Sequence, residues 1–153
     1  MKKIASFTVN HDLLDRGMYV SRVDGDVVTY DVRMKKPNGG DYLSVNAAHT
    51  LEHLFATYAR NQKDGTDVVY VGPMGCMTGF YFLARNSMSA ARAIELVKGA
   101  MEFARDFVGE IPGNSRKECG NYLSHDLTGA KAIGGEMAKV LESWQEKDLQ
   151  YKE

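Results

Sequence analysis

Apolar and polar residues alternate along two segments near the beginning of the chain. Residues 18–23 (MYVSRV) and 27–33 (VVTYDVR) are rich in β-branched and aromatic side chains, and the turn sequence Asp-Gly-Asp lies between them at 24–26. This pattern predicts a β-hairpin, because Gly in a short turn lets two strands fold back on each other. A shorter apolar stretch, SFTV at 6–9, predicts one additional strand.

Three other segments have apolar residues three or four positions apart, which is the spacing of one face of an α-helix. The pattern predicts helices over about 47–61, with Asn46 as the N-terminal cap, over about 89–108 and over about 127–144. The last residues, 145–153, are strongly charged, and we expect them to form a frayed tail.

Two more apolar runs, 66–71 (TDVVYV) and 79–85 (GFYFLAR), predict strands joined by the glycine-rich segment 72–78 (GPMGCMT). Together these elements predict an α+β fold, in which an antiparallel β-sheet packs against about three α-helices in a single domain spanning 1–153. Residues 109–126 have no periodic pattern, and a loop of this length in a compact domain is typical of a functional segment.

The composition narrows the classes of function. The chain has 153 residues and a net charge of −1, so no overall basic field attracts nucleic acid or an anionic membrane. We find no signal-peptide core and no apolar run long enough for a membrane span. The two cysteines, Cys76 and Cys119, are therefore expected to be free thiols of a cytoplasmic protein rather than a disulfide.

The sequence HTLEH at 49–53 places two of the four histidines of the chain on one predicted helix. At about 100° per residue, His49 and His53 lie about 40° apart, so both imidazoles can reach one metal ion. The leucine and phenylalanine residues of this helix fall on the opposite face and leave the histidine face free. Glu52 lies beside His49, and the set favours a metal site over a solvated polar face.

A pair of histidines needs at least one more protein ligand to hold a metal ion. The soft or basic candidates are Cys76, Cys119, His11 and His125, and spacing alone does not choose among them. Each cysteine could equally be a small buried apolar residue, and His125 most simply helps to begin the third helix.

Two alternatives follow from the motif by itself. The order H-x-x-E-H occurs in one class of zinc peptidases, in which Glu52 would activate a metal-bound water and Cys76 would have no role. The other alternative is a non-catalytic module with a structural metal, a kind of site that four protein ligands usually close.

Several short sequences, taken in this order and at this spacing, are similar to the S-ribosylhomocysteine lyase (LuxS) family. They are SFTVNH, YDVRMKKPN, HTLEH, PMGCMTGFY and CGNYLSHDL. The resemblance extends from about Ser6 to Trp144 and so covers nearly the whole chain. It implies cleavage of S-ribosylhomocysteine to homocysteine and 4,5-dihydroxy-2,3-pentanedione. The pentanedione is the precursor of autoinducer-2 in quorum sensing, and the reaction belongs to the activated methyl cycle.

The resemblance also implies roles for particular residues. His49, His53 and Cys119 would hold a divalent metal, natively Fe²⁺, with water in the fourth position, and Zn²⁺ or Co²⁺ can substitute. Cys76 and Glu52 would be the acid–base pair.

A homodimer with two active sites at its interface is implied as well. Ser6, Phe7 and His11 of one subunit would complete the pocket of the other, and Arg33 and Arg60 would help to hold the substrate. The implied partners are a small-molecule substrate and a second copy of the chain, without nucleic acid or membrane.

The chemistry of the implied reaction requires such groups. A carbonyl must move along the ribose before homocysteine leaves as a thiolate, and each step removes a proton from a carbon beside a carbonyl. A metal ion on that oxygen acts as a Lewis acid, while Cys76 and Glu52 can carry protons on the two faces of the sugar. Tyr70 is a departure, because many family members have an aspartate there that helps to bind the amino-acid end of the substrate, and a phenol brings no charge.

Overall fold

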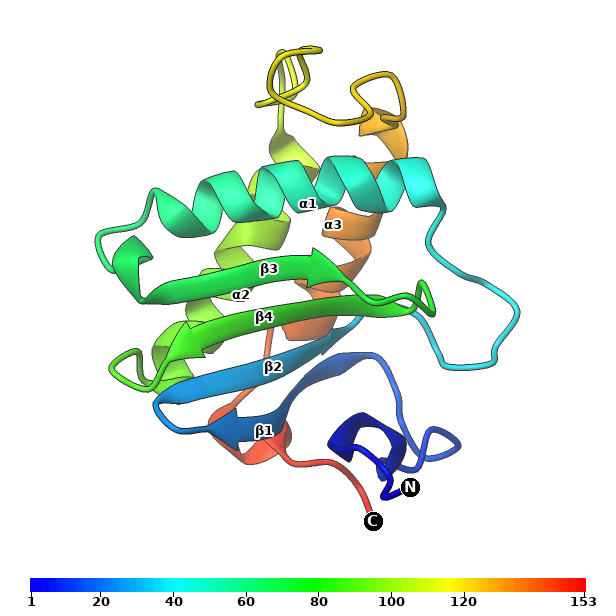
Figure 1. Ribbon diagram of the computed structural model, residues 1–153, viewed down its shortest axis with the longest axis vertical. Helices are drawn as coiled ribbons and strands as arrows, with labels where there is room; N and C mark the ends of the chain where they lie inside the picture. The colour runs from blue at the N-terminus through cyan, green and yellow to red at the C-terminus, as the bar shows by residue number, and fades with distance from the viewer.

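The two predicted hairpins pair with each other and form one antiparallel sheet with the strand order β1-β2-β4-β3 (Figure 1). The computed structural model describes all residues, 1–153. The strands are β1 Gly17–Asp24, β2 Val27–Arg33, β3 Val68–Pro73 and β4 Gly79–Arg85. All four strands of the predicted hairpins are therefore confirmed, and the α+β fold class with them.

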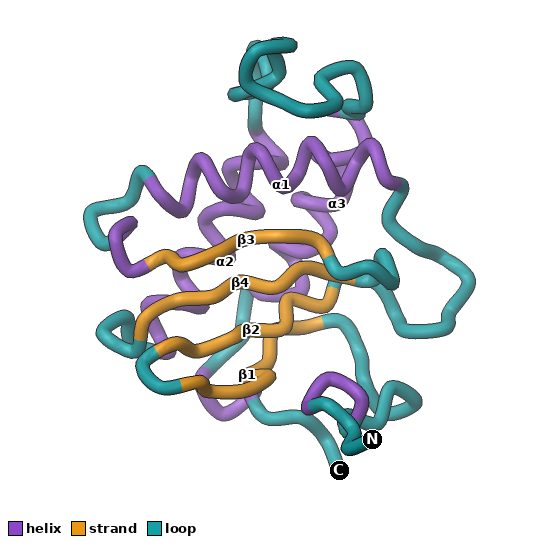
Figure 2. Tube along the Cα trace, viewed as in Figure 1, coloured by secondary structure: helices purple, strands orange, loops and turns teal.

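Three helices cover one face of the sheet and leave the other face uncovered (Figure 2). Their bounds are α1 Val45–Arg60, α2 Ala90–Asp106 and α3 Leu127–Leu141. Helix α1 lies along the β3 edge, whereas α2 and α3 lie behind the sheet. The three predicted helices are confirmed, although α3 ends three residues earlier than expected. None of them is both long enough and apolar enough to cross a membrane.

The beginning of α1 differs from the prediction because another side chain caps it. Ser44 has extended backbone angles, and its Oγ accepts a hydrogen bond from the backbone N–H of Ala47 at 3.2 Å. Asn46, the predicted cap, lies inside the first turn. The cap fixes where the helix starts, and therefore which turns carry His49 and His53.

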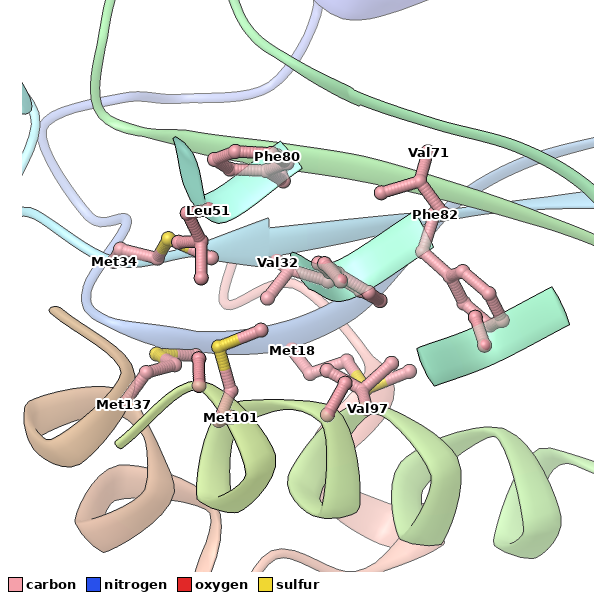
Figure 3. Packing of buried hydrophobic residues seen from close by; sticks show 14 of the residues in the cluster. Met18, Val32, Met34, Leu51, Val71, Phe80, Phe82, Val97, Met101 and Met137 are labelled. Atoms are coloured by element: carbon pink, nitrogen blue, oxygen red, sulfur yellow. The ribbon is translucent and has the colours of Figure 1, made fainter. Parts of the chain in front are cut away.

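The core lies between the sheet and the helices and contains a cluster of 30 buried residues (Figure 3). Phe80 and Phe82 of β4 are fully buried and pack against Phe55 of α1, with ring centroids 6.0 and 5.8 Å apart. Met101 of α2 and Met137 of α3 fill the space between helices and sheet. Each large apolar side chain buried in this way stabilises the fold by about 2 to 3 kcal/mol. This packing holds α1, which carries His49 and His53, against the sheet.

The strand predicted at 6–9 is wrong. Residues Ala5–Phe7 form a short 3₁₀ turn instead, and Thr8 donates both its backbone N–H and its hydroxyl to the carbonyl of Ala5, the hydroxyl at 2.7 Å. These local bonds satisfy the backbone without a partner strand. The turn lies beside the β1 end of the sheet (Figure 1).

The frayed tail predicted at 145–153 is also wrong. Glu146–Leu149 forms a 3₁₀ turn with a capping box, and Leu149 is buried in the core. The indole N–H of Trp144 donates to the carbonyl of Met18 at 2.8 Å, which ties the segment to β1. The charged composition of this segment hid the contribution of Leu149, which is buried, and of Tyr151, which hydrogen-bonds Asp31 of β2.

The long loop keeps its predicted irregular form. Residues 107–126 contain neither helix nor strand, and they pass over α1 on their way from α2 to α3 (Figure 1). This path brings Cys119 and its neighbours above the helix face that carries the two histidines.

Candidate metal centre and cysteine cavity

Helix α1 and the long loop bring four potential ligands into one cluster. One nitrogen each of His49, His53 and His125 and the sulfur of Cys119 all lie within 4.8 Å of one another. All four residues are partly buried. We call these residues the metal cluster. The spacing of four residues on α1 puts the two imidazoles on successive turns, and the loop supplies the other two ligands from above.

Hydrogen bonds to the loop orient both helix imidazoles. Nδ1 of His49 lies 2.8 Å from the carbonyl oxygen of Ser124, and Nδ1 of His53 lies 2.7 Å from that of Pro112. A carbonyl oxygen can only accept, so each Nδ1 carries the proton and donates it. The lone pair of each Nε2 is then free, and both face Cys119 Sγ, at 3.4 and 3.9 Å. This is the arrangement of metal-binding histidines, whose second nitrogen is held by an outer partner.

The sequence left His125 open as a ligand and assigned it most simply to the start of the third helix, whereas the structure places it in the metal cluster. Asp126 caps α3, whereas the His125 ring stacks on His49 with ring centroids 4.0 Å apart. Its Nδ1 lies 2.9 Å from the hydroxyl of Thr50, and its Nε2 is buried without a hydrogen-bond partner. Burial lowers the pKa of His125, and the electrostatic effect of the neighbouring His49 and His53 lowers it further, which favours the neutral ring.

The donor set of the metal cluster fits a divalent transition metal. Imidazole nitrogens together with a thiolate suit zinc, iron or cobalt, while calcium and magnesium prefer oxygen ligands. The buried Nε2 of His125, which no protein group satisfies, faces the same space. A buried polar atom without a partner is rare in a folded protein, and a bound ion with its ligands accounts for it.

Glu52 lies on α1 immediately before His53 and is not part of the metal cluster. It is half-buried, and its carboxylate makes no hydrogen bond or ion pair with any other residue. An unpaired carboxylate beside two imidazoles is available to accept and return protons.

A second group of predicted residues surrounds Cys76 in the turn between β3 and β4. They line a cavity of about 250 Å³ and include four more of the sequence candidates: Ser6, Phe7, His11 and Arg33. Cys76 itself is exposed, and its sulfur lies 3.0 Å from the hydroxyl of Thr78. We call this space the cysteine cavity.

Arg33 is buried under the cysteine cavity rather than lying on the surface. Only 3 % of the residue is exposed, and Asp31 binds its guanidinium through both carboxylate oxygens, at 3.1 and 2.7 Å. Burial disfavours the charge of Arg33, but the hydrogen bonds and the charge of Asp31 outweigh it, so the pKa of Arg33 is raised. A third N–H donates to Thr78 Oγ1 at 2.8 Å. The arginine thus stays charged and is fixed in one orientation.

The metal cluster and the cysteine cavity are separate within one chain. The residues that line the cysteine cavity include none of the four residues of the metal cluster. The N-terminal turn, which contributes Ser6 and Phe7 to the cavity, lies by β1, whereas the loop of the metal cluster lies over α1 at the opposite edge of the sheet (Figure 1). The structure therefore groups Cys76 with the N-terminal residues and not with the metal cluster.

Arg60 and Tyr70 lie outside both groups. The guanidinium of Arg60 donates to the carbonyls of Val68 and Val69, at 3.1 and 3.0 Å, and so holds the end of α1 to the start of β3. Tyr70 is 52 % exposed and lines a neighbouring cavity of about 330 Å³, which also includes Ser6.

Sequence analysis missed the partners that hold these side chains. Asp31 is two positions before Arg33 on β2, so both side chains lie on the same face of the strand, and that spacing was a usable signal. Thr78 and Tyr151 carried no such signal, because only the folded chain brings them to the cavity.

Comparison with known proteins agrees with this arrangement. Residues 4–148 match the family model described as S-ribosylhomocysteinase (LuxS). An S-ribosylhomocysteine lyase of Phocaeicola vulgatus is 46 % identical over 99 % of this chain and 98 % of its own length. The proteins of the same name from Porphyromonas gingivalis and Clostridium acetobutylicum are 45 % and 43 % identical, over 99 % and 100 % of both chains.

Proposed function

The chain belongs to the S-ribosylhomocysteinase (LuxS) family, and on that basis we propose that it cleaves S-ribosylhomocysteine to homocysteine and 4,5-dihydroxy-2,3-pentanedione. One observation carries the proposal: two oriented imidazoles and a thiol converge on one point, while a second, exposed thiol lines a cavity. The whole chain, 1–153, would act as a single lyase domain. The pentanedione would serve as the autoinducer-2 precursor, and the homocysteine would return to the activated methyl cycle.

We propose Fe²⁺ as the native metal, held by His49, His53 and Cys119, with Zn²⁺ or Co²⁺ able to substitute. Support comes from the mixed nitrogen and sulfur donors, which suit these ions. When bound, the ion supplies a Lewis acid that stabilises negative charge on a substrate oxygen. His125 would border the remaining coordination position and limit what can enter it.

Cys76 and Glu52 would move the protons. The hydroxyl of Thr78 accepts a hydrogen bond from Arg33, and its own hydrogen is then available to the sulfur of Cys76. A thiolate that receives this hydrogen bond next to a guanidinium is stabilised as a base. Glu52, which has no partner of its own, would return protons to the sugar oxygens from the other side.

Ser6, Phe7, His11, Arg33 and Arg60 would bind the substrate. Four of these five residues line the cysteine cavity, which supports their part in the proposal. Arg60 is used by the β3 backbone, so its contribution to substrate binding is the least supported.

We propose a homodimer in which each active site combines the metal cluster of one subunit with the cysteine cavity of the other. Neither half can carry out the reaction alone, because the proton carrier Cys76 and the ligands are separate within one chain. Large apolar side chains are exposed in both halves: Phe7 is 69 % exposed, and Val108 and Leu123 of the long loop are 86 % and 78 % exposed. Apolar surface of this kind is typical of a face that another chain covers. The two free cysteines and the need for a reactive thiol favour a cytoplasmic location.

The zinc-peptidase alternative has no support from the matched family, and neither has a module without catalysis, since the relatives are named as lyases. A direct test is to load the purified protein with Fe²⁺ anaerobically, add S-ribosylhomocysteine and measure free thiol against a sample without substrate. We expect homocysteine to accumulate, and Cys76→Ser to keep its metal but release none. No thiol release by the loaded wild-type protein would refute the proposed function.

A further inference from the structure

We propose that Tyr151, in the C-terminal tail, is a positioning residue for Cys76, because its hydroxyl holds Asp31 in the orientation that aims Arg33 at the cysteine cavity. This inference rests on the proposed function only for the catalytic role of Cys76, because the contacts themselves are observed in the structure. Tyr151 lies beyond residues 4–148, which match the family model.

The first contact joins the tail to β2. The hydroxyl of Tyr151 donates to Asp31 Oδ2 at 2.6 Å, and the ring stacks on Tyr19 of β1 with centroids 5.1 Å apart. Burial raises the pKa of Tyr151, and the negative charge of Asp31 raises it further, so the phenol keeps its proton and remains a donor.

The second contact passes the constraint to Arg33. Asp31 is only 1 % exposed, and its Oδ2 accepts from both Tyr151 and Arg33 while its Oδ1 accepts from Arg33 alone. A buried carboxylate with three donors has little freedom to rotate. Because Arg33 is bound through both oxygens, the plane of its guanidinium follows the plane of the Asp31 carboxylate.

The third contact reaches the reactive sulfur. Three of the five N–H groups of a guanidinium are used by Asp31 and Thr78, which leaves two for the cysteine cavity. Arg33 Nη1 lies 3.9 Å from Cys76 Sγ, and Thr78 Oγ1 lies 3.0 Å from the same sulfur. A rotation of the guanidinium would therefore alter both the hydrogen bond to the sulfur and the positive charge beside it.

Tyr151→Phe is the sharpest variant, because it removes the hydroxyl and keeps the ring that stacks on Tyr19. We expect the rate at which iodoacetamide alkylates Cys76 at neutral pH to fall about fivefold, since a charge-assisted hydrogen bond is lost. Mass spectrometry of the Cys76 peptide separates this rate from that of Cys119. We expect kcat to fall by a similar factor and KM to change less. Asp31→Asn should act in the same direction and more strongly.

Lys152→Ala is the matched control, since Lys152 is exposed and has no ion pair or side-chain hydrogen bond. Its alkylation rate and kcat should equal those of the wild type. A thermal midpoint for Tyr151→Phe close to that of the wild type excludes a general loss of structure. Alkylation of Cys76 at the wild-type rate in Tyr151→Phe would overturn the inference. Alkylation needs no substrate, so a wild-type protein that released no thiol would refute the proposed function and leave this measurement valid.

Discussion

The metal cluster and the cysteine cavity are built in different ways. Two of the four residues of the metal cluster come from one helix, where spacing along the sequence alone sets their separation. The cysteine cavity instead joins the N-terminal turn, three strands, a hairpin turn and the C-terminal tail. A site built on one helix is readable from sequence, whereas a site assembled from distant segments depends on side chains that only the fold brings together.

The largest expected effect comes from removing a ligand. His53→Ala takes away one of two nitrogens held by the loop, and we expect metal to be lost and thiol release to fall by at least about 1,000-fold. Metal analysis of the purified variant and the thiol assay measure both. A variant that kept a full complement of metal would contradict the assignment of His53 as a ligand.

The next test asks whether the two regions act across a dimer. His53→Ala and Cys76→Ala should each be inactive, but dissociated and reassociated together they should recover about a quarter of the wild-type activity, because half of the dimers are mixed and each has one intact site. Each variant carried alone through the same procedure is the control. If mixing restores nothing, each active site lies within a single chain.

Arg33→Lys should reduce kcat/KM about 100-fold while the metal content is unchanged. A lysine ammonium cannot bind both oxygens of Asp31 and also reach Thr78, so the cysteine cavity loses its fixed charge. Loss of metal in this variant would show that the two regions are coupled within the chain.

The smallest effect is expected at His125. His125→Gln removes the ring that stacks on His49 but none of the three proposed ligands, so we expect the affinity for Zn²⁺ or Co²⁺ to fall about tenfold. Competition with a chelator measures the change. An effect as large as that of His53→Ala would make His125 a ligand in its own right.

Particular residues show where sequence analysis succeeds. Both hairpins were predicted because alternation and a glycine-containing turn are local properties, and His49 and His53 were paired because a helix has a fixed period. Cys119 could be chosen among the four candidate ligands only by family resemblance, since nothing in its spacing sets the path of a 20-residue loop.

The errors have physical causes. The prediction of a strand at 6–9 was wrong because Thr8 forms local hydrogen bonds to the backbone carbonyl of Ala5. The alternation of apolar and polar residues does not reveal local bonds of this kind. The tail was judged by its charges, although Leu149 and Tyr151 were enough to anchor it. His125 was a candidate ligand but was assigned to the start of a helix, because its place in the metal cluster depends on the path of the loop over α1.

The loop between α2 and α3 has no ladder of its own, and its ordered form depends on a few bonds to α1. An ion bound by Cys119 of the loop and by the two imidazoles of α1 would therefore cross-link the loop to the helix. Arg116 and Lys117, which precede Cys119 in the loop, are exposed. The rate of trypsin cleavage at these two residues should therefore report the fraction of chains that carry metal.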